Sequence, residues 1–187
     1  MKTLLRSATE LDASKITTLV NRAYRPMADE RGWTHEADLV SGPRTTEEQV
    51  LALFCSRSSV LVLCRGTEID ACIHVTCRES CADIGMLATE PGYQTQGLGK
   101  QILEYAERYA SAHFGATSFR ISVLSSRPEL IAFYERRGYA RTGQTKSYPA
   151  SAGTGEPIVD GLLLEVLVKQ LATASHQIEK FPEGTTG

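Results

Sequence analysis

The apolar positions of this chain follow two different periods. Short apolar or alternating runs predict β-strands at residues 3–7, 59–64, 69–78, 82–89 and 118–124, with two further strands at 139–148 and 159–169. Helical spacing predicts helices from Leu11 to Tyr24, around Val50 to Phe54, from Leu98 to His113 and up to Arg137. The chain therefore mixes strands and helices throughout, which is typical of an α/β (α+β) domain.

Two short segments have the composition of helix N-termini. Thr45-Thr46-Glu47-Glu48 has the form of a capping box, and Ser126-Arg127-Pro128-Glu129 combines a cap, a favourable proline and a completing glutamate. Gly138 is expected to close the second of these helices. Between the two lies a strand, a glycine-rich turn, a long helix and another strand, so we expect that pair of strands to be parallel and joined by a right-handed crossover.

Two regions lack a clear period. Residues 26–44 contain the only tryptophan and several charged residues, and we expect a long loop with at most a short helical turn. The residues after Leu171 are polar, and we expect a mobile tail. The predicted organisation is a single domain over 1–171 followed by a tail over 172–187.

The composition excludes several classes of protein. Of the 187 residues, 42% are hydrophobic and 22% charged, and the net charge is -2. No apolar run approaches the roughly 18 residues that cross a bilayer, and no Lys/Arg-rich run suggests nucleic-acid binding. The N-terminus turns acidic too early for a secretory signal, so we expect a cytoplasmic protein with neither a membrane nor a nucleic-acid partner.

Cysteine and histidine spacing argues against a metal site. The five cysteines form no C-x-x-C pair, and the four histidines are isolated from one another. We expect reduced, buried thiols and no metal.

The turn before the long helix carries the most specific chemical signal. In Gln94-Thr95-Gln96-Gly97-Leu98-Gly99-Lys100 the glycines let the backbone approach a ligand, and the first helical amides point toward it. Such a site suits an anion, most simply a phosphate. Leu98 stands where a Walker A loop needs lysine, and Ile102 where a dinucleotide fingerprint needs its third glycine, so both of those readings fail.

This Q-x-x-G-x-G turn, together with Ala132-Phe133-Tyr134-Glu135-Arg136-Arg137-Gly138-Tyr139, resembles the GNAT superfamily of N-acetyltransferases. The resemblance implies a mixed, mostly antiparallel central sheet with a parallel strand pair at the acyl-CoA cleft and helices on both faces. It implies acetyl-CoA as co-substrate and direct transfer of the acetyl group to a primary amine in a ternary complex, with a homodimer possible. Three alternatives stay open: a CoA-binding sensor without turnover, a protein N-acetyltransferase, and a nucleotide-binding regulator.

The resemblance also assigns residues to the cofactor. It implies that the backbone of Leu87, Ala88 and Thr89 pairs with pantetheine, that the turn from Gln94 to Lys100 cradles the pyrophosphate, and that Phe133 and Tyr134 lie nearby. The cofactor-binding residues expected in the turn are Gln94, Thr95, Gln96, Gly97, Leu98, Gly99 and Lys100. Many members have an asparagine near the start of the following helix, where this chain has Ser125-Ser126-Arg127-Pro128. Ser126 or Arg127 is expected to make that contact instead.

Catalytic roles follow from the same resemblance. Tyr134 is expected to serve as the acid near the CoA sulfur, and the amide of Leu87 to polarise the thioester carbonyl. Asp83, eleven residues before Gln94, is the first candidate for the base, with ordered water as the alternative. Glu36, Glu79 and Glu90 are weaker candidates, and His74 is read as a hydrogen-bonded core histidine.

The acceptor is expected opposite CoA, next to the long loop. The candidate residues there are Asp29, Glu30, Trp33, Glu36, Asp38, Arg44 and Tyr148. The carboxylates suit a cationic amine, whereas Arg31 and Arg44 suit an acceptor that carries a carboxylate. The sequence leaves this choice open.

Overall fold

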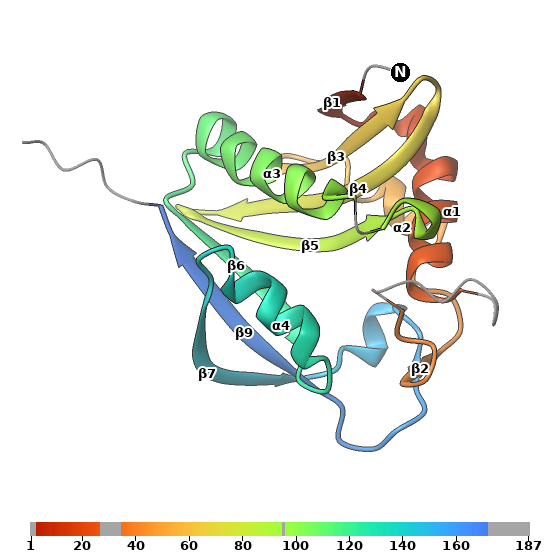
Figure 1. Ribbon diagram of the computed structural model, residues 1–187, viewed down its shortest axis with the longest axis vertical. Coiled ribbons are helices and arrows are strands. Elements are labelled where there is room, and N and C mark those ends of the chain that lie inside the picture. The colour runs from red at the N-terminus through yellow and green to blue at the C-terminus, as the bar shows by residue number, and fades with distance from the viewer. Residues whose placement is uncertain (1–2, 27–34, 95, 172–187) are drawn as a thin grey trace, which may run out of the picture.

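The computed structural model describes residues 3–26, 35–94 and 96–171, and these form a mixed sheet with helices on both faces (Figure 1). Seven strands run in the order β1-β3-β4-β5-β6-β9-β7. Their bounds are Thr3–Ser7 (β1), Ser58–Arg65 (β3), Glu68–Arg78 (β4), Cys81–Thr89 (β5), Ser118–Leu124 (β6), Ala140–Ser147 (β7) and Leu163–Gln170 (β9). Among the strands of the described residues only β5 and β6 pair in parallel, so the predicted mostly antiparallel sheet with one parallel pair is confirmed.

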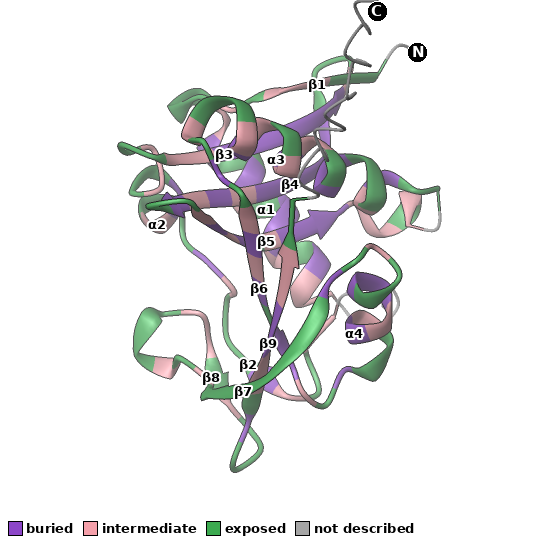
Figure 2. Cartoon of the chain, turned by 90° about the vertical axis from the view of Figure 1, so that its left-hand side faces the viewer, coloured by how far each residue is buried: buried purple, intermediate pink, exposed green. Residues whose placement is uncertain are grey.

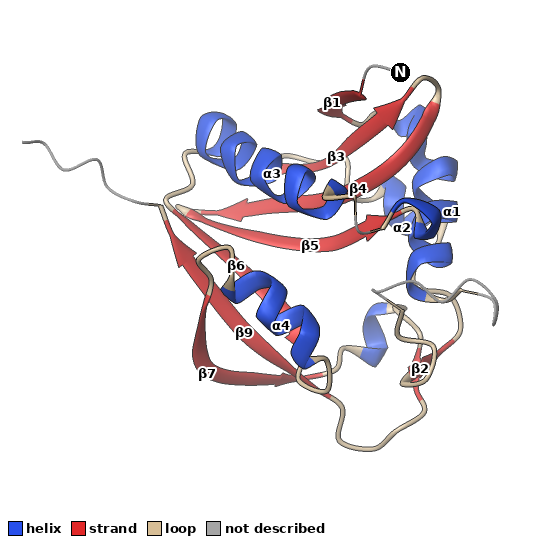
Figure 3. Cartoon of the chain, in the orientation of Figure 1, coloured by secondary structure: helices blue, strands red, loops and turns tan. Residues whose placement is uncertain are grey.

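The α-helices of the described residues pack on this sheet (Figure 3). They are α1 (Ala13–Tyr24), α2 (Glu47–Leu51), α3 (Leu98–Phe114) and α4 (Pro128–Glu135). Ile102 of α3 and Ile131 of α4 belong to one buried cluster, whereas Ile16 of α1 and Val50 of α2 belong to another. The two clusters occupy opposite faces, because alternate residues of β3 join each of them.

Short elements complete the chain. The 3-10 turns span Glu10–Asp12, Pro91–Tyr93 and Ala150–Ala152. A second sheet consists of β2 (Val40–Ser41) and β8 (Glu156–Pro157), which pair antiparallel. This small sheet ties the long loop before α2 to the loop before β9. The rest of the predicted 26–44 loop includes residues 27–34, and the predicted tail covers 172–187; both segments lie outside the described residues.

Helix starts differ from the prediction by one or two residues. The helix predicted from Leu11 begins at Ala13, because Glu10–Asp12 forms a 3-10 turn. The capping box of α2 is closed by Thr46 and Gln49 rather than by Thr45 and Glu48. In α4 the cap position is Arg127, one residue later than predicted, and Pro128 takes the first helical position.

The parallel strands stay together for only part of their length. β5 and β6 pair from Cys81↔Ser118 to Ile84↔Ile121 and then part, β5 continuing beside β4 and β6 beside β9 (Figure 1). The β4–β5 register shifts at this point, and Met86 adopts a left-handed conformation with φ 50°. A bulge of this kind bends a strand, so the sheet opens beyond Ile84.

The cysteines test a further expectation. The five thiols are free and Cys64, Cys72 and Cys77 are buried, but Cys55 is exposed, which corrects the prediction of buried thiols there.

At the edge of the sheet every residue of β7 is exposed, as Figure 2 shows along its length. The helices in the described part of the chain all lack the length or the apolar character that crossing a bilayer requires.

Candidate functional site

Two cavities meet where β5 and β6 separate. The first, of about 250 Å³, lies between β5, the start of α3 and α4. It is lined by Leu87, Thr89, Tyr93, Gln94, Gly97, Leu98, Gly99, Lys100, Phe133 and Arg137. The second, of about 290 Å³, lies on the other side of β5, and Leu87 lines both. Leu87 therefore marks the point where two bound molecules would meet.

The N-terminus of α3 opens onto the first cavity without a protein cap. Gly97 holds the cap position with φ 79° and ψ 7°, a left-handed conformation that favours glycine and supplies no capping side chain, and no side chain of residues 3–26, 35–94 and 96–171 bonds to the first helical amides. A Cβ built on Gly97 would meet nothing within 4 Å, so the space beside Gly97 is open, and the residues from Gly97 to Lys100 all line the cavity. The first amides of a helix that no side chain caps form an anion-binding site with the positive end of the helix dipole.

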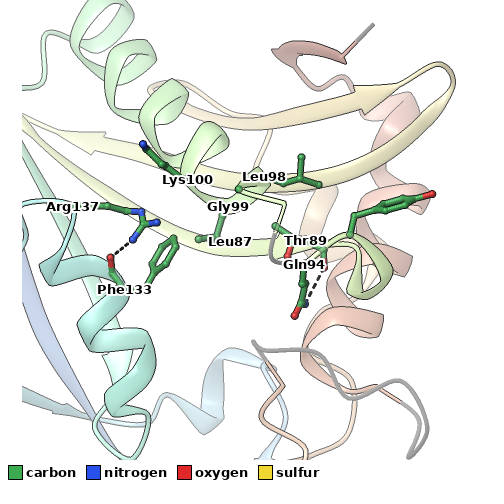
Figure 4. Close-up of a pocket in the computed structure, with 10 residues that line it drawn as sticks. Leu87, Thr89, Gln94, Leu98, Gly99, Lys100, Phe133 and Arg137 are labelled. Atoms are coloured by element: carbon green, nitrogen blue, oxygen red, sulfur yellow. Dashed lines mark hydrogen bonds between the residues drawn. The ribbon is translucent and has the colours of Figure 1, made fainter. Parts of the chain in front are cut away.

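The walls beyond this helix start are mainly apolar (Figure 4). A Cβ on Gly99 would lie 3.7 Å from the Phe133 ring and 3.8 Å from the Thr89 side chain, so α3 approaches β5 and α4 closely here. Gln94 reaches back across the turn, and its Nε2 donates a long hydrogen bond of 3.5 Å to the Thr89 carbonyl. The cavity thus joins a polar helix end to a narrow apolar passage.

Two cations lie at one end of this cavity, Lys100 from α3 and Arg137 from just after α4 (Figure 4). Lys100 is exposed and makes only a loose 3.8 Å ion pair with Glu104. The guanidinium of Arg137 sits 3.4 Å from the centre of the Phe133 ring and donates to the Phe133 carbonyl. Its Nε is buried without a hydrogen-bond partner in the described structure, and burial lowers its pKa. Sequence reasoning missed Arg137, although it precedes Gly138 within the quoted Phe-Tyr motif.

The predicted cofactor residues divide into three groups. Leu87, Thr89, Gln94, Gly97, Leu98, Gly99, Lys100 and Phe133 line the first cavity. Ala88 is buried in the core below it, Gln96 is exposed outside the lining, and Thr95 lies outside the described residues. Ser126 and Arg127 line a separate cavity beside His35, and Arg127 donates to the His35 carbonyl and to Glu129. Ser126 and Arg127 were predicted to contact the cofactor, but in the structure neither lines the first cavity.

Tyr134 lines the second cavity from α4. Its ring packs edge-on against Phe133 at 5.1 Å and more obliquely against Tyr139 at 5.8 Å. Burial raises the pKa of Tyr134 above its usual range, so its phenol stays protonated at neutral pH. The hydroxyls of Tyr24 and Tyr139 are held by the Leu87 carbonyl and by Glu107, each at 2.9 Å, whereas the hydroxyl of Tyr134 has no protein partner among the described residues.

Asp83 lines the second cavity but is engaged by Arg120. The two side chains face each other across β5 and β6, with Nε–Oδ1 at 2.5 Å and Nη2–Oδ2 at 2.7 Å. Asp83 precedes Leu87 by four residues, which corresponds to about 13 Å along a strand. If Asp83 took up a proton, its ion pair with Arg120 would weaken. The spacing between Asp83 and Leu87 is also too long for Asp83 to contact a group bound at Leu87 directly.

The other carboxylates considered as bases are also engaged or remote. Glu36 lines the second cavity but pairs with Arg25 at 3.1 Å, with both side chains only 11% exposed. Glu90 pairs with Arg22 at 3.1 Å, and Glu79 lies in the turn between β4 and β5. Neither Glu79 nor Glu90 lines the two cavities.

His74 also lines the second cavity, and its tautomer follows from its neighbours. The single hydroxyl proton of Ser58 is donated to the Leu53 carbonyl at 2.7 Å, so Nε2 of His74 must donate to the Ser58 oxygen at 2.8 Å. Nδ1 is then the unprotonated nitrogen. Burial lowers the pKa of His74 to about 4, so the ring is neutral near pH 7. This agrees with a hydrogen-bonded histidine that carries no charge.

Three of the residues expected to meet the acceptor line the second cavity, namely Glu36, Arg44 and Tyr148. Asp38 lies beside His35 at the neighbouring cavity instead. Asp29, Glu30, Arg31 and Trp33 lie outside the described residues. The cavity is thus built by segments far apart in the chain: α1, the long loop, β4, β5, β6, α4 and the loop around Tyr148.

Comparison with protein families identifies the central part of the chain. Residues 56–141 match the family described as acetyltransferase (GNAT) domain. This stretch contains β3 to β6, α3 and α4, and so both walls of the first cavity. No curated protein sequence matches the chain significantly.

Solved structures share the fold over nearly the whole chain. The ribosomal-protein-S18-alanine N-acetyltransferase from Escherichia coli is 17% identical with a TM-score of 0.69, covering 95% of this chain and 99% of its own. PaiA N-acetyltransferase from Thermoplasma acidophilum, solved with coenzyme A, is 14% identical with a TM-score of 0.65, covering 91% and 99%. YncA, a putative acetyltransferase from Salmonella typhimurium solved with acetyl-CoA, is 18% identical with a TM-score of 0.67, covering 92% and 96%. At these identities the likeness shows the fold.

Proposed function

We propose that this chain is an acetyl-CoA-dependent N-acetyltransferase. The premise is that it carries a GNAT acetyltransferase domain and is an acyltransferase of that class. In this proposal it moves an acetyl group directly to the primary amine of a small molecule or amino acid, with both substrates bound together. The observation that carries the proposal is the start of α3, where Gly97 leaves the helix amides uncapped and facing open space.

The first cavity suits coenzyme A in both charge and shape. The uncapped amides and the two cations, Lys100 and Arg137, would hold the diphosphate, because helix N-termini and guanidinium groups both favour phosphate oxygens. The apolar walls at Leu87, Leu98 and Phe133 would hold the pantetheine arm. The PaiA and YncA structures, solved with coenzyme A and acetyl-CoA, add support because they share this fold.

The acetyl group would then lie at Leu87, between the cavities. Beyond Ile84 the β6 side of β5 has no partner strand, so its backbone groups there are available to a ligand. The carbonyl of Leu87 is fixed by the Tyr24 hydroxyl at 2.9 Å, which steadies the neighbouring backbone. A preorganised amide donor at the thioester oxygen contributes on the order of 3 kcal/mol to catalysis.

Transfer would form a bond between the amine nitrogen and the acetyl carbon and break the bond from that carbon to sulfur. Tyr134 would donate a hydrogen bond to the departing thiolate through its unpartnered hydroxyl. A free thiol has a pKa of about 8.5, and burial raises the pKa of Tyr134 above its usual range. The phenol therefore stabilises the thiolate without giving up its proton. The proton lost by the amine nitrogen then reaches the sulfur through water.

Water is also the better candidate for the first proton acceptor. An alkylammonium group has a pKa of about 10.4, so the acceptor is protonated near neutral pH and must lose a proton before it attacks. The ion pair of Asp83 with Arg120, and the distance of Asp83 from Leu87, favour ordered water over direct proton transfer to Asp83. Asp83 would act only at the far end of a chain of such waters, because about 13 Å along the strand is more than one water spans.

Three features of the sequence-based prediction stay predictions: the single domain over 1–171, the cytoplasmic location and a homodimer. The exposed edge strand β7 is the place where a second copy would add.

Calorimetric titration with acetyl-CoA, CoA and ATP tests the binding half of the proposal. Tight binding of both CoA forms is expected, and binding of ATP alone would reject the assignment in favour of a nucleotide-binding protein. Release of free CoA thiol with a panel of amines, amino acids and peptides tests the enzymatic half. CoA binding without turnover of any amine in the panel would favour a sensor.

A further inference from the structure

We infer that the acceptor is an amine carrying a carboxylate and an apolar side chain, most simply an apolar amino acid, and that Arg44 binds its carboxylate. This inference rests on the proposed function, because it names the substrate of the same site. It depends on which charges in the second cavity are already paired and which are not.

The carboxylates that line the second cavity are compensated by arginines. Glu36 is paired with Arg25, which also donates to the carbonyls of Tyr24, Gly42 and Thr154, so this pair is part of the framework. Asp83 is held on both oxygens by Arg120. Neither pair leaves a net negative charge to attract a substrate that is only a cation.

Arg44 is the exception among these cations. It lines the second cavity and has no carboxylate within ion-pair distance in the described parts of the chain. A half-buried guanidinium without an anion is costly, and it recovers that cost when a carboxylate binds to its planar donor fork. The charge left over in the cavity is therefore positive, and it favours an acceptor with a carboxylate.

The position of Arg44 is fixed by packing and by hydrogen bonds. Asn21 of α1 accepts from the Arg44 amide at 2.7 Å and from the Thr45 amide at 3.1 Å, which anchors this loop on α1. The guanidinium carbon lies 5.2 Å from the centre of the Tyr24 ring, and the hydroxyl of Tyr24 donates to the Leu87 carbonyl. One tyrosine ring thus separates the cation from the strand position where transfer is proposed.

The rest of the lining sets the other part of the acceptor. Ile84, Ile121, Val123, Leu124, Leu130 and Leu164 all line the second cavity. These apolar residues come from β5, β6, β9 and α4, whereas Arg44 comes from the loop before α2. At about 290 Å³ the cavity has the size of a small ligand site, so it suits one amino acid better than a folded protein surface.

Paired substrates and paired variants test this inference. The substrates are leucine and methionine, each with its carboxamide, so that only the carboxylate differs within a pair. The variants are Arg44→Gln, which removes the charge, Arg44→Lys, which keeps the charge but loses the fork, and Arg108→Gln, a control on the exposed side of α3. Thiol release gives kcat/KM, and calorimetry gives CoA affinity for each variant.

We expect the wild type to prefer the free amino acids over their carboxamides. Arg44→Gln should lower kcat/KM for the amino acids roughly 10- to 100-fold and leave the carboxamides within about twofold, since a hydrogen-bonded charge pair is lost only in the first case. For the amino acids, kcat/KM of Arg44→Lys should lie between the values of the wild type and Arg44→Gln. Arg108→Gln should have the kcat/KM of the wild type. CoA affinity should be equal in all four proteins.

The inference is overturned if the carboxamides react as well as the amino acids, or if Arg44→Gln slows both members of each pair equally. Should CoA bind but no panel member react, titration of the CoA complex with leucine decides: binding lost in Arg44→Gln supports the inference, and absence of binding to the wild type overturns it. Absence of CoA binding would instead reject the proposed function, so the two failures are distinguishable.

Discussion

The two cavities on either side of Leu87 are built in different ways. The first takes eight of its ten lining residues from one continuous stretch, 87–100, and its polar surface is mainly backbone. The second draws on segments from Tyr24 to Leu164, and its polar surface combines neutral polar side chains with charged ones, of which Asp83 and Arg120 pair with each other. One continuous segment can form the binding site of a cofactor that does not vary. A site for an acceptor that differs between enzymes depends on several loops whose sequences can change independently.

The difference also separates two kinds of electrostatics. In the first cavity the helix end and two cations point at an open space. In the second, Glu36 and Asp83 are neutralised within the protein, and Arg44 remains. Substitutions should therefore divide into those that change CoA binding and those that change turnover.

The largest effect is expected for Gly97→Glu. A carboxylate placed before the uncapped amides would repel the diphosphate and strain a left-handed position, so CoA affinity should fall by about 1000-fold or more. Gln101→Glu adds the same charge one turn later on an exposed position, and calorimetry should show nearly unchanged affinity. Normal CoA binding by Gly97→Glu would mean that the phosphate site lies elsewhere.

Tyr134→Phe should separate turnover from binding. Loss of the hydroxyl removes the hydrogen bond to the leaving thiolate, and kcat should fall about 100-fold with CoA affinity unchanged. Tyr105→Phe, a half-buried tyrosine of α3 that lines neither cavity, serves as the control. Full turnover by Tyr134→Phe would remove Tyr134 from the mechanism.

The pH dependence of stability should report on the second cavity through His74. Burial depresses its pKa to about 4 in the folded protein from an ordinary value of 6.5. Between these values the unfolded chain binds a proton that the folded protein does not, so the free energy of unfolding should decrease as the pH falls from 6.5 towards 4. The loss should be on the order of 2 kcal/mol.

Urea unfolding of His74→Gln measures this contribution, since glutamine donates to Ser58 without titrating. The variant should lose less stability over that pH range, and replacing the exposed His113 by glutamine should leave the profile unchanged. Identical profiles for His74→Gln and the wild type would show that His74 titrates normally.

The smallest effect is expected for Arg137→Met. Methionine retains apolar contact with Phe133 but removes the cation, so CoA affinity should fall about tenfold, with kcat unchanged. The affinity of the variant should also depend less on salt than that of the wild type. Arg136→Met at the adjacent exposed position is the control, and an equal loss in both variants would exclude a specific contact.

The sequence predicts the regular parts of this molecule well. The bounds of β1 and β6 match the prediction to the residue, because alternating or continuous apolar runs end sharply there. Gly97 and Gly99, which the family resemblance assigns to the cofactor, line the first cavity, and their role there stays a prediction. Two-residue strands such as β2 and β8 carry no period, so their pairing could not be predicted from the sequence.

Side chains whose role depends on distant partners were harder to predict. Asp83 was chosen by its spacing from Gln94, but its partner Arg120 comes from a strand 37 positions later. Arg127 was expected at the cofactor, but the His35 carbonyl, 92 positions earlier, holds it. Arg137 was missed because a second arginine beside Arg136 gives no sign of which one faces the cavity.

The parting of β5 and β6 leaves strand edges without a partner strand inside the molecule rather than only at its rim. Proteins commonly protect rim strands with charge or twist, but an interior split must stay open for its substrate. In the proposed complex the amide-bearing arm of CoA fills part of that opening and acts as a surrogate strand. Unliganded protein should therefore be the form most prone to self-association on storage, and added CoA should act as its solubilising excipient.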